Sequence, residues 1–245
     1  PNNWQSVFGG PAWAWDNRRR QYYLHNFLAG QPDLNLHNGD VQEALLGVAR
    51  FWLERGVDGF RLDALNFAMH DPALRDNPAR TAFDRPPTRP FDFQEHRYNQ
   101  AQPGVGAFLE RIRSLTDSYQ PARFTVAEVA TGDPYPVMSD YTAGGRRLNT
   151  AYSFDYLYAD AVDGGLVNAT SMQSPAIPDA GWPALAFSNH DAPRVVSRWS
   201  AGAPSPQHAK LYALLLLSLH GNIFLYQGEE LGLPQADVPF EKLQD

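Results

Sequence analysis

Residues 56–64 constrain the fold more than any other stretch, because a helical pattern ends where they begin and they lead to an acid. Apolar side chains at Val57, Phe60 and Leu62 predict a short buried strand of a parallel sheet. Such a strand delivers the side chain of Asp63 to the carboxyl edge of the sheet, where α/β barrels carry their catalytic residues. The stretch therefore predicts an α/β fold with a carboxylate at its active edge.

Arg61 precedes Asp63 by two residues, so on an extended strand the two side chains point to the same face. The guanidinium would then hold the carboxylate in its ionised form and fix its orientation. An ordinary salt bridge at a strand end would look the same in sequence. The stretch alone leaves the catalytic and the structural interpretation open.

A helix is expected over residues 40–55, with Asp40 as its N-cap, Glu43 completing a capping box and Gly56 at the C′ position. Apolar residues at helical spacing predict one buried stripe, formed by Val41, Ala44, Leu45, Val48, Ala49, Trp52 and Leu53. The strand that leads to Asp63 follows at once. This order of elements is one helix-to-strand step of an α/β fold.

The alternation continues along the chain. We expect strands at 124–129, 149–158, 184–188 and 223–226, and helices at 105–115 and 205–221. Strands that alternate with helices favour a parallel sheet whose active edge lies at the strand ends. No Gly-rich phosphate-binding motif follows any of these strands, so nucleotide binding has no support.

Two long segments lack a regular pattern. Residues 66–103 form an excursion of the length that is typical of a functional loop. Its His70 and His96 are expected to be surface or hydrogen-bonded residues rather than catalysts. Residues 1–37 are irregular and rich in aromatic side chains, which either fill a small subdomain or stack on a ligand.

Composition excludes several classes of function. The 245 residues contain no cysteine, which rules out disulfides and a cysteine nucleophile and fits a reducing, cytoplasmic compartment. The net charge of -7 argues against nucleic acid or an anionic membrane as a partner. Lys210 and Lys242 are the only lysines in the sequence, which argues against a catalytic lysine. The longest apolar run, residues 211–226, is too short and too polar to span a bilayer.

Three acids, Asp63, Glu128 and Asp191, lie at the ends of separate predicted strands, so a closed barrel would bring them together at its mouth. Glycoside hydrolysis needs one ionised carboxylate and one protonated carboxyl, whose environments separate their pKa values. Asp63 beside Arg61 suits the ionised role. Glu128, which has apolar sequence neighbours and no adjacent cation, suits the protonated role. A divalent-metal site and a structural network of ion pairs remain open alternatives.

The motifs resemble those of the α-amylase superfamily, the retaining glycoside hydrolases of family 13. They are Gly-Phe-Arg-Leu-Asp at 59–63, Ala-Glu at 127–128 and Phe-Ser-Asn-His-Asp at 187–191. Gln-Pro-Asp-Leu-Asn at 31–35 is similar to the inserted B domain of oligo-1,6-glucosidases and α-glucosidases, and Tyr-Gln-Gly-Glu-Glu at 226–230 to the eighth barrel strand. The resemblance implies a partial TIM (β/α)8 barrel, from the third helix through the eighth strand. It further implies that residues 1–37 are the end of a B domain and residues 38–245 are barrel.

The resemblance also implies roles for individual residues. Asp63 would be the nucleophile and Glu128 the general acid/base, while Asp191 would bind hydroxyl groups of the sugar ring. Further substrate-binding positions would be Arg61, His190, Phe27, Gln31 and Phe8. The substrates would be short α-glucosides such as maltose or sucrose, with no cofactor and no metal. Ala64, where relatives that cleave 1,6-bonds usually carry valine, favours α-1,4 bonds or broad specificity.

The family's first motif would lie before Pro1, and the remaining strands and a C-terminal domain are expected from the rest of a longer polypeptide. Transfer of glucose to a sugar acceptor is as compatible with the motifs as hydrolysis. The alternatives are a non-catalytic relative that serves as an interaction domain and, with less support, a magnesium-dependent lyase.

Overall fold

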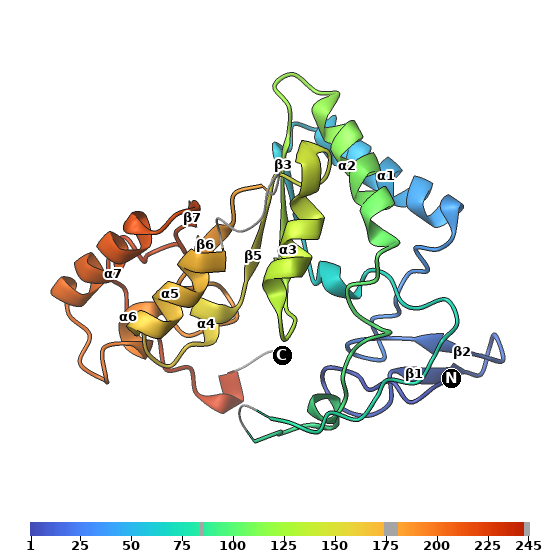
Figure 1. The fold of residues 1–245 in the computed structure, drawn as a ribbon, viewed down its shortest axis with the longest axis horizontal. Coiled ribbons are helices and arrows are strands. Elements are labelled where there is room, and N and C mark those ends of the chain that lie inside the picture. Colours follow the sequence, from blue (N-terminus) through green and yellow to red (C-terminus); the bar gives the residue numbers. More distant parts are fainter. Residues whose placement is uncertain (84–85, 174–180, 243–245) are drawn as a thin grey trace. The chain divides into compact units, whose positions relative to one another are not determined.

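The computed structural model describes residues 1–83, 86–173 and 181–242 (Figure 1). The chain forms two compact units, unit 1 from Pro1–Thr131 with Arg146–Leu148 and unit 2 from Gly132–Gly145 with Asn149–Asp245. Among the described residues, no helix has both the length and the apolar character that crossing a membrane requires.

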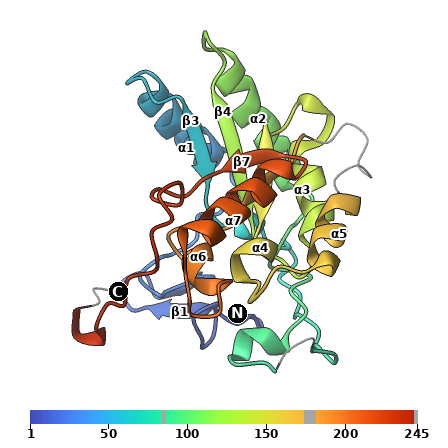
Figure 2. The same ribbon diagram turned by 90° about the vertical axis from the view of Figure 1, so that its left-hand side faces the viewer.

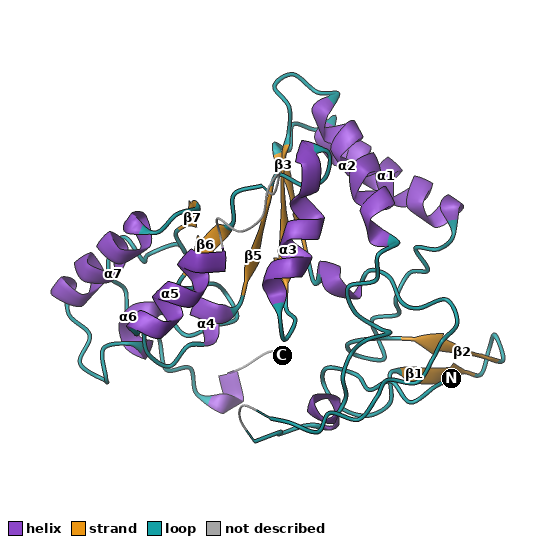
Figure 3. Cartoon of the chain, in the orientation of Figure 1, coloured by secondary structure: helices purple, strands orange, loops and turns teal. Residues whose placement is uncertain are grey.

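Unit 1 begins with an antiparallel hairpin of β1 (Trp13–Asp16) and β2 (Gln21–Leu24), drawn as two paired arrows in Figure 3. The sequence suggested that residues 1–37 are irregular, but the hairpin shows that part of this segment has regular structure. Aromatic residues favour strands because their rings pair across neighbouring strands. Here the rings of Trp15 and Tyr22 are opposite each other, with centroids 5.0 Å apart.

A small aromatic core holds the hairpin. Trp4 is completely buried and packs with Ala12 and Leu24, and its indole N–H donates a 2.9 Å hydrogen bond to the carbonyl of Arg75. The aromatic residues of this segment thus include a core that fills a subdomain. Phe8, by contrast, is 63% exposed.

Helix α1 (Gly39–Leu53) begins earlier than expected, and its N-cap is Asn38. The backbone of Asn38 is extended, and its side-chain oxygen accepts a 2.8 Å hydrogen bond from the N–H of Asp40. The assignment of Asp40 as the cap was therefore wrong, because Asn38 satisfies a free N–H of the first turn. Gly56 has a φ of +92°, the left-handed backbone expected after a helix, although the C-cap is Glu54.

The predicted apolar stripe of α1 is only partly correct. Leu53 is buried, as predicted, and so is Leu46, which the stripe did not include, whereas Val48 and Trp52 are about half exposed. The α1 helix packs along α2 (Val105–Asp117), and a helix face becomes buried only where a neighbour covers it. Glu43 pairs with Arg111 of α2 instead of closing a capping box.

Strands β3 (Gly59–Leu62) and β4 (Phe124–Val129) of unit 1 pair in parallel, and Figure 2 shows them side by side. Their register places Arg61 opposite Val126. Gly59 allows the strands to approach closely, because a Cβ at this position would lie 1.9 Å from the carbonyl oxygen of Phe124. The strand predicted at 124–129 is confirmed.

The excursion after β3 contains two short 3-10 helices, η1 (Leu65–Phe67) and η2 (Pro90–Phe93). Buried amides connect this excursion to residues 1–37, the hairpin segment. Asn77 donates a 2.8 Å hydrogen bond to Asn99, which donates a 3.4 Å bond to Asn26. Both predicted non-catalytic histidines have structural contacts: the carbonyl of His70 accepts a 2.7 Å hydrogen bond from the ring of His37, and the ring of His96 stacks on Phe91.

Unit 2 alternates short helices and strands. They are α3 (Pro134–Thr142), η3 (Ala143–Gly145), β5 (Thr150–Ser153), α4 (Asp155–Tyr158), α5 (Gly164–Gln173), β6 (Ala184–Ala186), α6 (Val195–Arg198), α7 (Pro206–Ser218), β7 (Asn222–Phe224) and η4 (Phe240–Lys242). The strand predicted at 149–158 is wrong in its second half. Asp155 starts α4 instead, and its carboxylate accepts hydrogen bonds from Ser153 (2.8 Å) and Tyr135 (2.6 Å).

Strands β6 and β7 pair in parallel, with Ala184 opposite Asn222. Both are shorter than the sequence predicted. The hydroxyl of Ser188 accepts a 2.9 Å hydrogen bond from the N–H of Val195, and the N–H of Tyr226 donates to Glu229. Local side-chain hydrogen bonds of this kind replace the ladder beyond the last strand residues.

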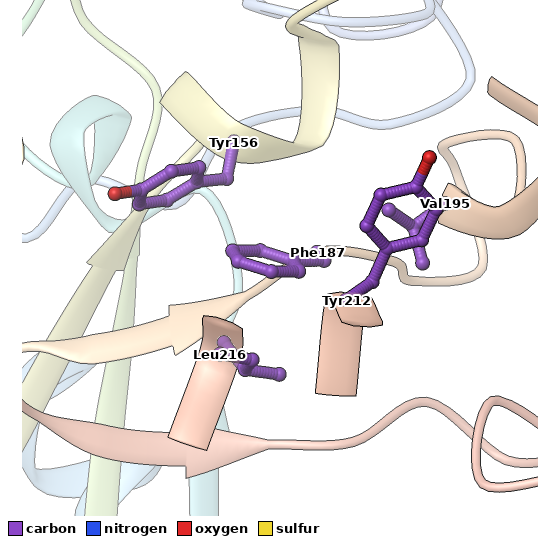
Figure 4. Packing of buried hydrophobic residues seen from close by; sticks show 5 residues of the cluster. All are labelled: Tyr156, Phe187, Val195, Tyr212 and Leu216. Atoms are coloured by element: carbon purple, nitrogen blue, oxygen red, sulfur yellow. The ribbon is translucent and has the colours of Figure 1, made fainter. Parts of the chain in front are cut away.

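Phe187 lies at the centre of the apolar core of unit 2, where it packs against Tyr156 and residues of α6 and α7 (Figure 4). Ser205 caps α7, as the sequence predicted, by accepting a hydrogen bond from the N–H of His208. Another face of α7 is open, with Leu211, Leu214 and Leu217 each more than half exposed.

Candidate active site

Asp63 directly follows β3, and the side chain of Arg61 from the same strand donates a hydrogen bond to its Oδ1. The predicted placement on one face of the strand is confirmed. The carboxylate of Asp63 is 74% exposed, so solvent and ligands reach it. An exposed carboxylate that is oriented by a fixed cation has the geometry of a nucleophile or of an anchor for a polar ligand.

Glu128 lies on the neighbouring strand β4 and is 5% exposed. Its Oε1 accepts a hydrogen bond from Arg61, and its Oε2 accepts a 2.8 Å hydrogen bond from the backbone N–H of Ala64. The expectation that Glu128 has no adjacent cation was wrong. The cation comes from the adjacent strand, and a cross-strand neighbour cannot be read from the sequence of a single strand.

The structure thus brings Asp63 and Glu128 together on one guanidinium. Glu128 is buried and accepts hydrogen bonds from Arg61 and Ala64, whereas the carboxylate of Asp63 is largely exposed. The two carboxyl groups therefore have different environments, one open to solvent and one enclosed. Paired carboxyl groups of this kind can divide the tasks of nucleophile and proton donor.

A metal ion at this position would face an unfavourable charge. Arg61 places a positive charge between the two carboxylates, where it would repel a divalent cation. Throughout the described part of the chain, no three His, Asp or Glu side chains are grouped so that they could hold a metal.

Ala64 connects the two strand ends. Its φ of 42° lies in the left-handed region, which is uncommon for a residue with a side chain. Its N–H donates to Glu128, and the residue is the N-cap of the η1 helix. The residue after Asp63 is therefore held by the second carboxylate.

Asp191 and His190 belong to unit 2, where they follow β6. The side-chain oxygen of Asn189 accepts hydrogen bonds from the N–H groups of Asp191 (2.9 Å) and Ala192 (2.7 Å), which fixes a tight turn. His190 Nε2 lies 3.4 Å from Asp191 Oδ2. Both side chains line a pocket of about 480 Å³.

The same pocket contains residues that the sequence motifs did not assign to the site. Arg194 donates a 2.7 Å hydrogen bond to the carbonyl of Gln227 and lies 4.8 Å from the ring centroid of Tyr226. Next to the pocket, burial raises the pKa of Glu229, whose carboxylate accepts a 3.0 Å hydrogen bond from the N–H of Tyr226. The feature of the sequence that could have indicated these pocket residues is Arg194, three residues after Asp191.

The three predicted positions in the hairpin segment differ in their surroundings. The ring of Phe27 lies between Phe8, at a centroid distance of 5.8 Å, and Phe67, at 5.2 Å. Phe67 ends the η1 helix that follows Ala64, so Phe27 packs against the segment that leaves Asp63. Gln31 is exposed, and its side chain accepts a 3.3 Å hydrogen bond from the N–H of Leu28 in a local turn.

Residues 1–245 match the family model described as Alpha amylase, catalytic domain. A probable alpha-glucosidase of Rhizobium meliloti is 49% identical over 252 residues, a match that covers 100% of this chain and 46% of the relative. An oligo-1,6-glucosidase of Heyndrickxia coagulans is 33% identical over 262 residues, with 100% and 45% covered. The chain spans about half the length of these relatives.

Solved structures agree with this assignment. The alpha-glucosyl transfer enzyme XgtA is 49% identical and superposes with a TM-score of 0.94 over 100% of this chain and 46% of that one. A trehalose-6-phosphate hydrolase of Bacillus licheniformis is 32% identical with a TM-score of 0.78, over 96% and 42% of the two chains. The chain therefore belongs to the α-amylase catalytic-domain family, whose fold is the TIM barrel.

Proposed function

We propose that this chain carries the central catalytic residues of a retaining α-glucosidase. The observation that carries the proposal is the shared guanidinium of Arg61, which holds Asp63 and Glu128 on neighbouring strand ends. Retaining glycosidases need two carboxyl groups about 5–5.5 Å apart, one as nucleophile and one as proton donor. A single guanidinium bound to both groups is compatible with that separation.

Asp63 would attack the anomeric carbon while Glu128 gives its proton to the departing oxygen. The product is a covalent glucosyl-enzyme, in which Asp63 is an uncharged ester and Glu128 an anion. Glu128 then takes a proton from water as the water attacks the same carbon and releases Asp63. In this intermediate Arg61 and the N–H of Ala64 are both available to stabilise the Glu128 carboxylate.

Asp191 and His190 would bind hydroxyl groups of the same glucose. The support is the family motif together with the pocket in unit 2, which combines both side chains with Arg194 and Tyr226. Phe27, with Phe8 and Gln31, would line the glucose site from the hairpin segment.

The substrates we propose are short α-glucosides such as maltose or sucrose. Relatives named as alpha-glucosidase, oligo-1,6-glucosidase and alpha-glucosyl transfer enzyme support this class. Ala64 favours α-1,4 bonds or broad specificity over 1,6-bonds. Transfer to a sugar acceptor uses the same glucosyl-enzyme, with the acceptor hydroxyl in place of water.

We further propose that the chain supplies the barrel from its third helix through its eighth strand, with residues 1–37 from an inserted B domain. The order of the family motifs along the sequence supports this placement. A reducing, cytoplasmic location is our proposal on the absence of cysteine.

The test is turnover by the protein expressed at its natural length, on maltose, isomaltose, sucrose and starch. We expect cleavage of the small glucosides, little action on starch, and release of α-glucose as the first product in the NMR spectrum. An Asp63→Asn variant prepared in parallel controls for contaminating enzymes. Release of β-glucose, or no action on any glucoside by the folded protein, would refute the proposal.

A further inference from the structure

The side chain of Asn66 joins the segment that follows Asp63 to the segment that follows Glu128. Its Nδ2 donates a 3.2 Å hydrogen bond to the carbonyl of Ala130, and its Oδ1 accepts a 3.2 Å hydrogen bond from the N–H of the same residue. Asn66 is 1% exposed, so these bonds are shielded from water. The carboxamide therefore pairs with one backbone residue in both directions.

Asparagine and glutamine carry a neutral carboxamide, whose donor and acceptor lie side by side and can pair with the C=O and N–H of one backbone residue. Asparagine is the shorter of the two, and at this position it spans from η1 to the end of β4. The carbonyl of Asn66 also accepts a 2.7 Å hydrogen bond from the N–H of Ala101, where the long excursion returns. Asn66 thus connects its own segment, after Asp63, to two others, at Ala130 and at Ala101.

The strand ends are joined by the backbone pairing of β3 with β4, which reaches Leu62 and Ala127, and also by hydrogen bonds to carboxyl groups that would change charge in the reaction. Arg61 binds Asp63 and Glu128, and the N–H of Ala64 binds Glu128. A hydrogen bond to a carboxylate weakens when that carboxylate takes up a proton or forms an ester. The pair formed by Asn66 and Ala130 contains no titratable group and keeps its strength throughout.

We infer that Asn66 is a positioning residue, which fixes the spacing between Asp63 and Glu128 while the charges on these acids change. The inference rests on the proposed function and adds to it a residue that touches neither substrate nor reacting atoms. Misplacement of a reacting group by about 1 Å can cost on the order of 100-fold in rate, so a small shift of one strand end is sufficient to be measured.

The experiment compares substrates that differ in their need for a proton. In the protein at its natural length, kcat/KM is measured on two substrates. Maltose releases glucose, a poor leaving group that needs a proton, and 2,4-dinitrophenyl α-glucoside releases dinitrophenolate, which leaves without protonation. Asn66→Ala removes both hydrogen bonds. Asn66→Asp keeps the shape and the accepted bond and loses the donated one, so it carries the test if the alanine variant does not fold.

We expect Asn66→Ala to lower kcat/KM on maltose at least about 10-fold more than on the aryl glucoside, with a smaller difference for Asn66→Asp. Asn77→Ala is the matched control, because Asn77 is another buried amide, 3% exposed, whose side chain bonds to Asn99. It should reduce the melting temperature while leaving the ratio of the two kcat/KM values unchanged.

An unchanged ratio in both Asn66 variants, or the same change in Asn77→Ala, would overturn the inference and leave the proposed function intact. A wild-type protein that is folded and inactive on both substrates would instead remove the proposed function, and the inference with it.

Discussion

The backbone N–H of Ala64 donates a 2.8 Å hydrogen bond to Oε2 of Glu128, so the residue next to Asp63 is held by the other acid of the site. Ala64 itself has a φ of 42°, in the left-handed region. Backbone conformations of this kind persist only where the surroundings stabilise them. Glu128 is one such stabilising group, and its charge is therefore coupled to the position of Asp63.

Asp63→Asn should abolish turnover and leave the fold intact. The side chain is 74% exposed, so little stability depends on its charge, and asparagine can still accept a hydrogen bond from Arg61. The measurement is kcat on maltose together with the melting temperature. A rate near that of the wild type would eliminate Asp63 as the nucleophile.

Glu128→Gln should spare substrates with good leaving groups relative to substrates with poor ones. The amide oxygen of glutamine can still accept from Ala64, but it has no proton to give, and general acid catalysis contributes about 10²–10⁴-fold where it is needed. The readout is kcat/KM on a series of aryl α-glucosides of increasing leaving-group pKa. Equal losses along the whole series would refute the assignment of Glu128 as proton donor.

Arg61→Lys should lose far more activity than retention of charge suggests. A guanidinium can donate to Asp63 and Glu128 at the same time in a fixed plane, whereas an ammonium group is a single point of charge. Arg123→Lys is the matched control, since Arg123 forms an ion pair with the exposed Asp58 at the other end of the same strands. A kcat of Arg61→Lys within about 3-fold of the kcat of Arg123→Lys would contradict this prediction.

The pH dependence of stability should show the pair of Asp71 and Arg75. Hydrogen bonds from the Arg75 side chain, foremost among the contributions, lower the pKa of Asp71 from 3.8 to about 2. Because the folded state binds this proton less tightly than the unfolded state, the pair stabilises the fold above pH 3.8 and loses this effect as the pH falls towards 2.

Asp71→Asn should therefore lower the free energy of unfolding at pH 6, and its difference from the wild type should shrink as the pH falls from about 5 to about 3. Urea unfolding of both proteins at a series of pH values measures this. A difference that stays constant over the range would show that the charge of Asp71 contributes nothing. The same loop carries the carbonyl of Arg75, which accepts the indole N–H of Trp4, so the effect should extend to the aromatic core.

Sequence periodicity predicted elements well where burial follows a regular pattern, and less well where side-chain hydrogen bonds decide the ends. The strand at 124–129 was predicted to the residue because it is buried along nearly its whole length. The cap of α1 was misplaced because Asn38 and Asp40 are both good capping residues, and only the backbone angle at Asn38 decides between them.

The candidate site shows the same division. The pairing of Arg61 with Asp63 follows from the period of two residues along a strand. The pairing of Arg61 with Glu128 depends on the register of β3 against β4, which places residues more than sixty apart in sequence next to each other. The two hydrogen bonds between Asn66 and Ala130 depend on that register too, and no local pattern in the sequence indicates them.

The open face of α7 has a practical consequence for experiments on residues 1–245 alone. Leu211, Leu214 and Leu217 project from one side of this helix into water, each more than half exposed. Isolated molecules are expected to aggregate through these leucines, and the resulting loss of measured activity could be mistaken for an inactive site. Light scattering should therefore be measured with every assay of residues 1–245. Replacing the three leucines with glutamate should prevent the aggregation and so show whether the site itself is active.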